Sequence, residues 1–134
     1  MKITLLKMLH MPRNYTKAQE DFVETLLMLE RDGEPLETTR VAKKLNISKP
    51  AVHQMGHELI DRGLITRKDY GDMKLTEAGR KLAEEVLHRH EVLKEFLISI
   101  NVEEAIAESD CCQIEHVISD ETLLAIEKFV ENHK

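Results

Sequence analysis

The sequence predicts a mainly α protein, with an N-terminal winged helix-turn-helix followed by a second, helical domain. Three observations predict this class. Apolar residues make up 42% of the 134 residues and charged residues 33%, whereas aromatic residues reach only 4%, a balance that suits amphipathic helices better than packed sheets. Apolar positions recur at helical spacing in most segments, and two short helical patterns are followed at once by a hairpin pattern. A chain of this length buries one good core, or one small domain with a helical appendage.

The first elements are an arm and a helix. Residues 1–14 contain three methionines and no helix cap, so they are interpreted as an arm ahead of the domain, without an assigned function. Thr16 and Gln19 have the spacing of a capping box, and apolar residues recur from Phe22 onwards until Arg31-Asp32-Gly33. The pattern predicts a helix over about 17–31.

Two short helices joined by a tight turn come next. Thr38 or Thr39 is expected to cap a helix that ends at Asn46. Ser48 is the expected cap of a second helix over 49–61, because Pro50 fits a first turn and Gly63 stops the pattern. Two short helices in this arrangement are a helix-turn-helix.

A hairpin and further helices complete the chain. The β-capable runs 64–68 and 73–75 flank a turn-forming segment, which predicts the wing. Thr76 is expected to cap a long helix from 77 to about 99, followed by short helices over 102–109 and 111–118 and a last helix capped by Ser119. The predicted division is an arm at 1–14, a winged helix-turn-helix domain at 15–76 and a helical domain at 77–134.

Charge and cysteine content narrow the class of protein. The net charge is −6, but residues 1–75 carry 13 Lys/Arg against 11 Asp/Glu, a net of +2, whereas residues 76–134 carry 6 against 14, a net of −8. The N-terminal part therefore suits DNA better than the whole chain does. No apolar run reaches the roughly 18–20 residues that span a bilayer. The only two cysteines, Cys111 and Cys112, are adjacent and cannot close a long loop. We expect a cytoplasmic protein without membrane association.

Residues of the kinds that bind metals occur on three predicted helices. The candidates are Asp21 and Glu24 on the first helix, His90 on the long helix, and Cys112, Glu115 and His116 near residue 115. The last three have the spacing i, i+3, i+4, which places a thiolate, a carboxylate and an imidazole on one helix face, where they can converge on one ion. Each feature alone is more often solvated surface charge. Glu108 lies one turn before Cys112, and for it the interpretation as surface charge is preferred.

The helix-turn-helix supplies candidate DNA contacts. The second helix of such a motif presents its N-terminal residues to base edges in the major groove. Gln54 can make paired hydrogen bonds to adenine, and Pro50 or Ala51 can touch thymine methyl groups. The candidate set is Ser48, Lys49, Pro50, Ala51, His53 and Gln54 on the helix, with Lys43, Lys44, Arg67, Lys68 and Lys74 for phosphates. Metal binding by His53 and His57 is not favoured.

The order of these parts resembles the diphtheria toxin repressor and manganese transport regulator (DtxR/MntR) family of metal-dependent transcriptional repressors. The resemblance runs from Thr16 to the C-terminus. Its matching stretches are Glu20 to Glu24, Val41 through Ile65, Leu75 to Arg80, His88 to His90 and Ile114 to Glu121. It implies a metal site built from Asp21, Glu24, His90, Cys112, Glu115 and His116, a homodimer formed through the C-terminal helices, and double-stranded operator DNA as the partner. Because the chain ends near residue 134, the compact form without an SH3-like third domain is expected.

The resemblance does not identify the metal, so we infer it from the chemistry of the ligand atoms. Asp21 and Glu24 resemble the manganese-sensing branch, whereas Cys112 resembles the iron-sensing branch. A thiolate is a poor ligand for Mn²⁺, which favours Fe²⁺, with Mn²⁺ as the alternative and Co²⁺, Ni²⁺ or Zn²⁺ able to substitute in vitro. Lys94 stands where the iron branch is expected to have an acidic ligand, which argues against that branch's second site. A paired-ion cluster that shares Glu24 and His90 stays open. Metal-uptake genes are the expected targets.

Two other functions stay open at this stage. A small metalloenzyme would use similar ligands, but the sequence offers no nucleophile elbow, phosphate loop or His-Glu-x-x-His motif, so no catalysis and no small organic substrate are expected. A winged-helix regulator that is not gated by metal would leave the same acidic residues merely solvated. Metal-dependent DNA binding separates this second alternative from the repressor.

Overall fold

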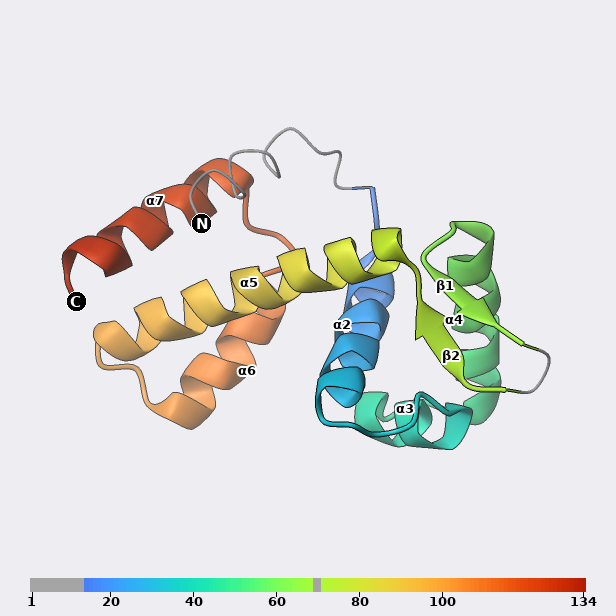
Figure 1. Cartoon of the computed structure of the whole chain (residues 1–134). Coiled ribbons are helices and arrows are strands. Elements are labelled where there is room, and N and C mark those ends of the chain that lie inside the picture. The colour runs from blue at the N-terminus through green and yellow to red at the C-terminus, as the bar shows by residue number, and fades with distance from the viewer. Residues whose placement is uncertain (1–13, 69–70) are drawn as a thin grey trace. The chain divides into compact units, whose positions relative to one another are not determined.

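The computed structural model describes residues 14–68 and 71–134 (Figure 1). The elements in order are α2 (Lys17–Arg31), α3 (Thr38–Leu45), α4 (Lys49–Asp61), β1 (Ile65–Arg67), β2 (Met73–Leu75), α5 (Glu77–Ser99), α6 (Glu104–Ile114) and α7 (Asp120–Asn132). The mainly α prediction and the order of helix-turn-helix, hairpin and helical domain are confirmed. The predicted arm, apart from Asn14, and positions 69 and 70 of the predicted turn lie outside the described residues.

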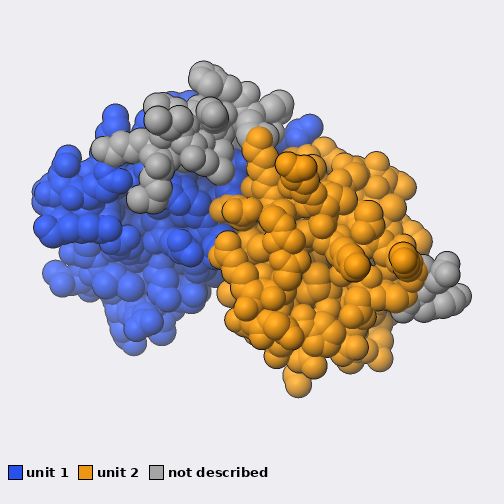
Figure 2. All heavy atoms as spheres, viewed as in Figure 1, with its two compact units in different colours: residues 1–14, 85–134 blue, residues 15–84 orange. Residues whose placement is uncertain are grey.

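Two compact units make up the chain (Figure 2). The boundary between them falls inside α5. Residues 15–84 form one unit, and residues 85–134 contribute the helices of the other. Each unit is described by itself below. None of the helices in the described part of the chain is long and apolar enough to cross a membrane.

The unit of residues 15–84 has a core shared by three helices and the hairpin. α2, α3 and α4 contact one another, and the strands pack on α2 and α4. The buried apolar side chains of this core include Phe22, Val23, Leu26, Val41, Val52, Leu59, Leu64, Ile65 and Met73. Their spacing is the helical and alternating pattern on which the prediction depended, so this core confirms the pattern.

Local caps set most of the helix ends. The Thr16 hydroxyl accepts from the Gln19 amide at 3.1 Å, and the Gln19 side-chain oxygen accepts from the Thr16 amide at 3.0 Å, as the capping box predicts. Ser48 caps α4 by accepting from the Ala51 amide at 3.1 Å. The predicted threonine cap of α3 is wrong, because Glu37 occupies the cap position without a side-chain bond.

The hairpin is joined tightly to the start of α5. β1 and β2 pair antiparallel, with Thr66 opposite Lys74. The Thr76 amide donates to the Leu64 carbonyl at 3.0 Å, and the Thr76 hydroxyl donates to the Gly63 carbonyl at 2.7 Å. The Gly79 backbone lies so close to strand β1 that a Cβ there would meet the Leu64 carbonyl oxygen at 1.9 Å. Only glycine allows this approach, which fixes the first turn of α5 against the strand.

In the unit of residues 85–134, a small apolar core joins three helices. Val92 and Leu93 of α5, Cys111 of α6 and Leu123 of α7 form its centre. The Ser119 hydroxyl caps α7 by accepting from the Thr122 amide at 3.2 Å, as the sequence predicts.

One prediction in this unit is wrong. The expected helices over 102–109 and 111–118 are a single helix, α6, which passes through Asp110 and ends at Ile114. The reason is that Ala107 and Cys111 are both buried at a separation of four residues, so the apolar face continues across the polar Ser109-Asp110 pair. Glu115 is the C-terminal cap residue and His116 follows it in a turn.

Candidate metal centre and DNA-binding surface

The candidate DNA-contacting side chains lie on the solvent face of the winged helix-turn-helix. The exposed ones are Lys43, Lys44, Ser48, Lys49, Pro50, His53, Gln54, Lys68 and Lys74, and Ala51 and Arg67 are half-buried. Val52 and Leu59 on the opposite face of α4 are fully buried. The N-terminal half of α4 therefore presents polar side chains outward from a helix that its own core holds in place.

Arg67 of the hairpin makes contacts that the sequence did not reveal. Its guanidinium donates to the Thr38 hydroxyl at 2.6 Å and to the Gly71 carbonyl at 2.9 Å, and it lies 3.3 Å from the His53 Nδ1 atom. One side chain thus joins the wing to α3 and to α4. Arg67 holds the wing against the helix-turn-helix, a role in addition to the phosphate contact predicted for it.

The metal-ligand candidates of the C-terminal unit gather around His90 of α5. The Cys112 Sγ atom lies 3.7 Å from His90 Nδ1, and the Glu115 Oε1 atom lies 3.2 Å from the same nitrogen. The His116 Nε2 atom is 3.9 Å from Glu115 Oε1, and the side chains of Glu115 and His116 are 1% and 3% exposed. Four of the six predicted ligands are therefore near neighbours, and a carboxylate and two imidazoles are largely withdrawn from water.

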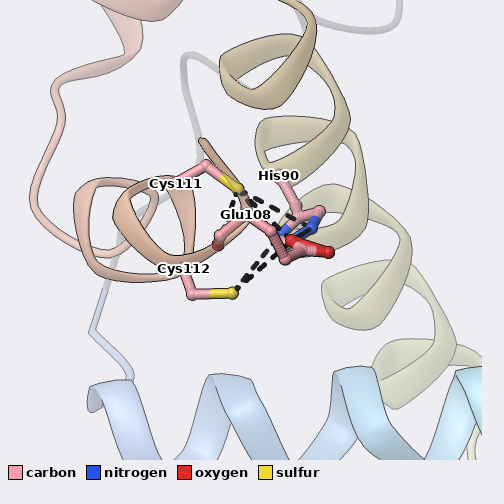
Figure 3. A group of neighbouring side chains, drawn as sticks. All are labelled: His90, Glu108, Cys111 and Cys112. Atoms are coloured by element: carbon pink, nitrogen blue, oxygen red, sulfur yellow. Dashed lines mark hydrogen bonds and ion pairs between the residues drawn. The ribbon is translucent and has the colours of Figure 1, made fainter. Parts of the chain in front are cut away.

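Two further side chains complete a cluster on the α6 side of His90. Figure 3 shows Glu108, Cys111 and Cys112 of α6 turned toward His90. His90 Nε2 and Glu108 Oε2 are 2.6 Å apart, and Cys111 Sγ lies 3.6 Å from His90 Nδ1 and 3.6 Å from Glu108 Oε2. One ligand atom from each of the four residues lies within 4.8 Å of every other.

Sequence reasoning missed Cys111. The predicted ligand set contains Cys112 and not Cys111, because Cys112 has the i, i+3, i+4 spacing with Glu115 and His116. Burial, followed by the neighbouring Cys112 and Glu108 charges, raises the pKa of the Cys111 thiol to about 12. Its spacing from Glu108 is a sequence signal, but only the packing of α6 on α5 brings this thiol to His90. Glu108, which was weighed as surface charge, is in contact with the same imidazole.

His88 is near His90 in the sequence but faces another element. Its Nε2 atom lies 2.6 Å from Glu127 Oε2 on α7. Side chains two residues apart on a helix point about 200° apart, so His88 and His90 contact different neighbours. Lys94, one turn after His90, lies 3.6 Å from Glu108 and 3.7 Å from Glu104.

The predicted ligands Asp21 and Glu24 belong to α2 in the other unit. Both are half-buried, and the Lys17 ammonium donates to Asp21 Oδ2 at 2.8 Å. Their spacing of three residues puts both carboxylates on one helix face. Their participation in a site with His90 stays a prediction from the sequence.

The donor chemistry fits a divalent transition-metal ion. Imidazole suits Fe, Cu, Ni and Zn, carboxylate suits harder ions, and thiolate suits softer ones. A buried carboxylate beside two imidazoles and two thiols is a donor set that such an ion binds in the interior of a protein. A winged helix-turn-helix in the same chain as this donor set defines a metal-responsive, DNA-binding regulator of transcription.

Comparisons with known proteins give the family. A family model described as "Iron dependent repressor, N-terminal DNA binding domain" matches residues 14–73, and one described as "Iron dependent repressor, metal binding and dimerisation domain" matches residues 76–134. An HTH-type transcriptional regulator of Methanocaldococcus jannaschii is 34% identical over 86% of this chain and 94% of its own length. The transcriptional regulator MntR of Escherichia coli is 34% identical over 85% of this chain and 74% of its own. The chain belongs to the iron-dependent repressor family of metal-dependent transcriptional repressors.

Solved structures agree on the fold. The manganese regulator SloR superposes with a TM-score of 0.75 at 24% identity, over 84% of this chain and 53% of SloR, so this chain spans about half of that protein. A protein from Sulfolobus solfataricus superposes with a TM-score of 0.68 at 20% identity, over 88% of this chain and 91% of its own. The family consists of transcriptional regulators, in agreement with the expectation of a non-enzyme.

Proposed function

We propose that this repressor binds operator DNA as a homodimer when a divalent ion is held by Asp21, Glu24, His90, Cys112, Glu115 and His116. Fe²⁺ is the favoured effector, and genes of metal uptake are the targets. Residues 15–76 act as the DNA-binding domain and residues 77–134 as the metal-binding and dimerisation domain, in the cytoplasm. The observation that carries the proposal is the buried Glu115 carboxylate, 3.2 Å from His90 and adjacent to His116.

The ligand residues act through their charge and their places on three elements. Asp21, Glu24 and Glu115 are carboxylates of like charge, and bringing them together without a cation is unfavourable. A bound divalent ion supplies the positive charge that offsets this repulsion. The three elements are then held in one orientation, which selects dimers whose two recognition helices fit the operator half-sites. By linkage, operator DNA raises the affinity for metal by the same factor.

The choice of Fe²⁺ rests on Cys112. A thiolate favours softer ions than Mn²⁺, and the carboxylates and imidazoles suit Fe²⁺ equally well. Mn²⁺ is the alternative, and the name of the Escherichia coli relative, MntR, supports it. Co²⁺, Ni²⁺ and Zn²⁺ are expected to bind in vitro.

DNA recognition is assigned to the exposed half of α4. Gln54 is the candidate for paired hydrogen bonds to adenine, with Pro50 and Ala51 on thymine methyl groups. Lys49 at the start of α4 and Lys68 and Lys74 on the wing would contact phosphates. One recognition helix reads few base pairs, so two copies of the chain are needed for selective binding.

The test is an anaerobic titration of the chelator-treated protein with Fe²⁺, and separately with Mn²⁺. The readout is the fluorescence anisotropy of labelled DNA from upstream of the protein's own gene. Tighter binding with either ion supports metal activation, and the ranking of the two ions tests the role assigned to Cys112. Strong DNA binding in chelator that no divalent ion changes would refute the proposal.

Two variants test the ligand set directly. Glu115→Gln and His116→Ala are each expected to abolish the metal-dependent gain in DNA affinity, with the fold and the dimer preserved. Glu91→Gln is the matched control, because Glu91 is an exposed carboxylate on α5 directly after His90 in the sequence. Normal activation of both ligand variants would remove these residues from the site.

A further inference from the structure

We propose that His90, Glu108, Cys111 and Cys112 form a second, four-coordinate metal site, selective for soft, tetrahedral ions of the zinc and cadmium type. Two of its members, Glu108 and Cys111, are absent from the six-residue set above. All four residues lie in one unit of the chain, on α5 and α6 (Figure 3). The site therefore requires no ligand from α2.

The distances match the edges of a tetrahedron around such an ion. Bond lengths of about 2.3 Å to sulfur and 2.0–2.2 Å to nitrogen and oxygen give edges between ligand atoms of roughly 3.4–3.8 Å. The Cys111 and Cys112 sulfurs lie 3.6 and 3.7 Å from His90 Nδ1. The same sulfurs lie 3.6 and 3.9 Å from Glu108 Oε2. The four distances from the two sulfurs to the His90 imidazole and the Glu108 carboxylate are thus close to the edges of a metal-bound tetrahedron.

Two contacts of His90 have to change when an ion binds through Nδ1. Glu115 Oε1 lies 3.2 Å from this nitrogen and must withdraw. His90 Nε2 and Glu108 Oε2 are 2.6 Å apart, the length of a hydrogen bond rather than of a tetrahedral edge. The Glu108 side chain is 46% exposed, so its carboxylate can turn at small energetic cost.

The helix geometry explains how one segment serves two ligand sets. Glu108, Cys111 and Cys112 have the spacing i, i+3, i+4, which puts them on one face of α6. Cys112, Glu115 and His116 repeat this spacing in the sequence four residues later, where Glu115 is the C-terminal cap residue and His116 lies beyond the helix. Cys112 and His90 are common to both sets, so the two sites exclude each other.

This exclusion predicts discrimination between metals, a consequence that rests on the proposed function. An ion that prefers thiolates and four-coordination is retained at the second site, and Asp21 and Glu24 are then not recruited. An ion that prefers oxygen and nitrogen ligands occupies the six-residue set instead. Zn²⁺ is therefore expected to bind tightly while activating DNA binding less than Fe²⁺ or Mn²⁺ does.

Cobalt absorption spectroscopy of the reduced, full-length chain tests the site without DNA. Tetrahedral Co²⁺ gives strong visible bands, and its near-ultraviolet charge-transfer intensity grows with the number of thiolate ligands. The wild-type protein is expected to show the intensity of two thiolates, and Cys111→Ser that of one. Glu108→Gln, at a half-exposed position that the fold does not need, is expected to weaken Zn²⁺ binding by at least roughly tenfold. Glu91→Gln serves as the control and is expected to match the wild type.

The outcomes separate this inference from the proposed function. An unchanged charge-transfer intensity in Cys111→Ser, together with unchanged Zn²⁺ affinity in Glu108→Gln, would overturn the second site. If the spectra behave as expected but no ion alters DNA binding, the proposed function fails and the second site stands. If both stand, Cys111→Ser is expected to make Zn²⁺ a better activator, and circular dichroism checks that this variant is folded.

Discussion

Replacing Gly79 by alanine is expected to destabilise the winged helix-turn-helix strongly. A Cβ at this position would lie 1.9 Å from the Leu64 carbonyl oxygen and 2.9 Å from the carbonyl carbon. Ordinary carbon–oxygen contacts are about 3.3 Å, so α5 and strand β1 must separate by roughly 1.4 Å. Both partners are backbone, and no flexible side chain can absorb the movement.

The size of the effect follows from what this separation breaks. The Thr76 amide would lose its 3.0 Å bond to the Leu64 carbonyl, a loss of about 1 kcal/mol. Overpacking of a close-packed contact adds roughly 1–3 kcal/mol. We expect Gly79→Ala to lower the free energy of unfolding by about 2–4 kcal/mol.

Urea denaturation followed by far-ultraviolet circular dichroism measures this loss. With a slope of about 1–3 kcal/mol per molar urea, the midpoint should fall by about 1 M or more. Gly56→Ala is the control, because nothing lies within 4 Å of a Cβ at that position in α4 and alanine is the better helix former there. Gly56→Ala should leave the midpoint unchanged or raise it. A Gly79→Ala protein as stable as the wild type would refute the close approach.

Three further substitutions test other contacts of the same unit. Arg67→Lys keeps the positive charge but loses the hydrogen bonds that join the wing to α3 and α4, so the affinity for operator DNA should fall several-fold. An unchanged affinity would mean that Arg67 contributes only a phosphate contact. Ser48→Ala removes the α4 cap and should cost about 1 kcal/mol in urea denaturation. The Arg80 guanidinium holds the pKa of Glu30 below its usual value, so their pair stabilises the fold above pH 4.5 and this contribution is lost as the pH falls through the lowered pKa. Both side chains are more than a third exposed, so Glu30→Gln should cost less than about 1 kcal/mol at neutral pH, and the difference from the wild type should vanish in acid.

Helix ends could be predicted from sequence wherever a local cap sets them. Thr16, Ser48 and Ser119 each bond within three residues, and such bonds depend only on the chain beside them. The error at α6 has the opposite origin. Asp110 is a polar residue that often begins a helix, and only the burial of Ala107 and Cys111 against a distant part of the chain keeps that helix continuous.

The candidate metal site could be predicted only in part, for a similar reason. The i, i+3, i+4 spacing groups Cys112, Glu115 and His116, which are near neighbours although α6 ends at Ile114, and the resemblance to a family adds His90. Helical spacing alone points the adjacent side chains of Cys111 and Cys112 about 100° apart. The proximity of Cys111 to His90 therefore depends on how α6 packs on α5. Tertiary contacts of this kind have no periodicity along the chain.

The continuity of α5 restricts how this protein can change length in evolution. The first turn of this helix packs on Leu64 at Gly79, and the same helix carries His90 eleven residues later in the sequence. Inserting or deleting one residue between them would turn every following side chain by about 100° about the helix axis. Only changes close to whole helical repeats, such as seven or eleven residues, keep the phase. Recombination between relatives should therefore be tolerated inside this helix only when the two parents keep the same count between glycine and histidine.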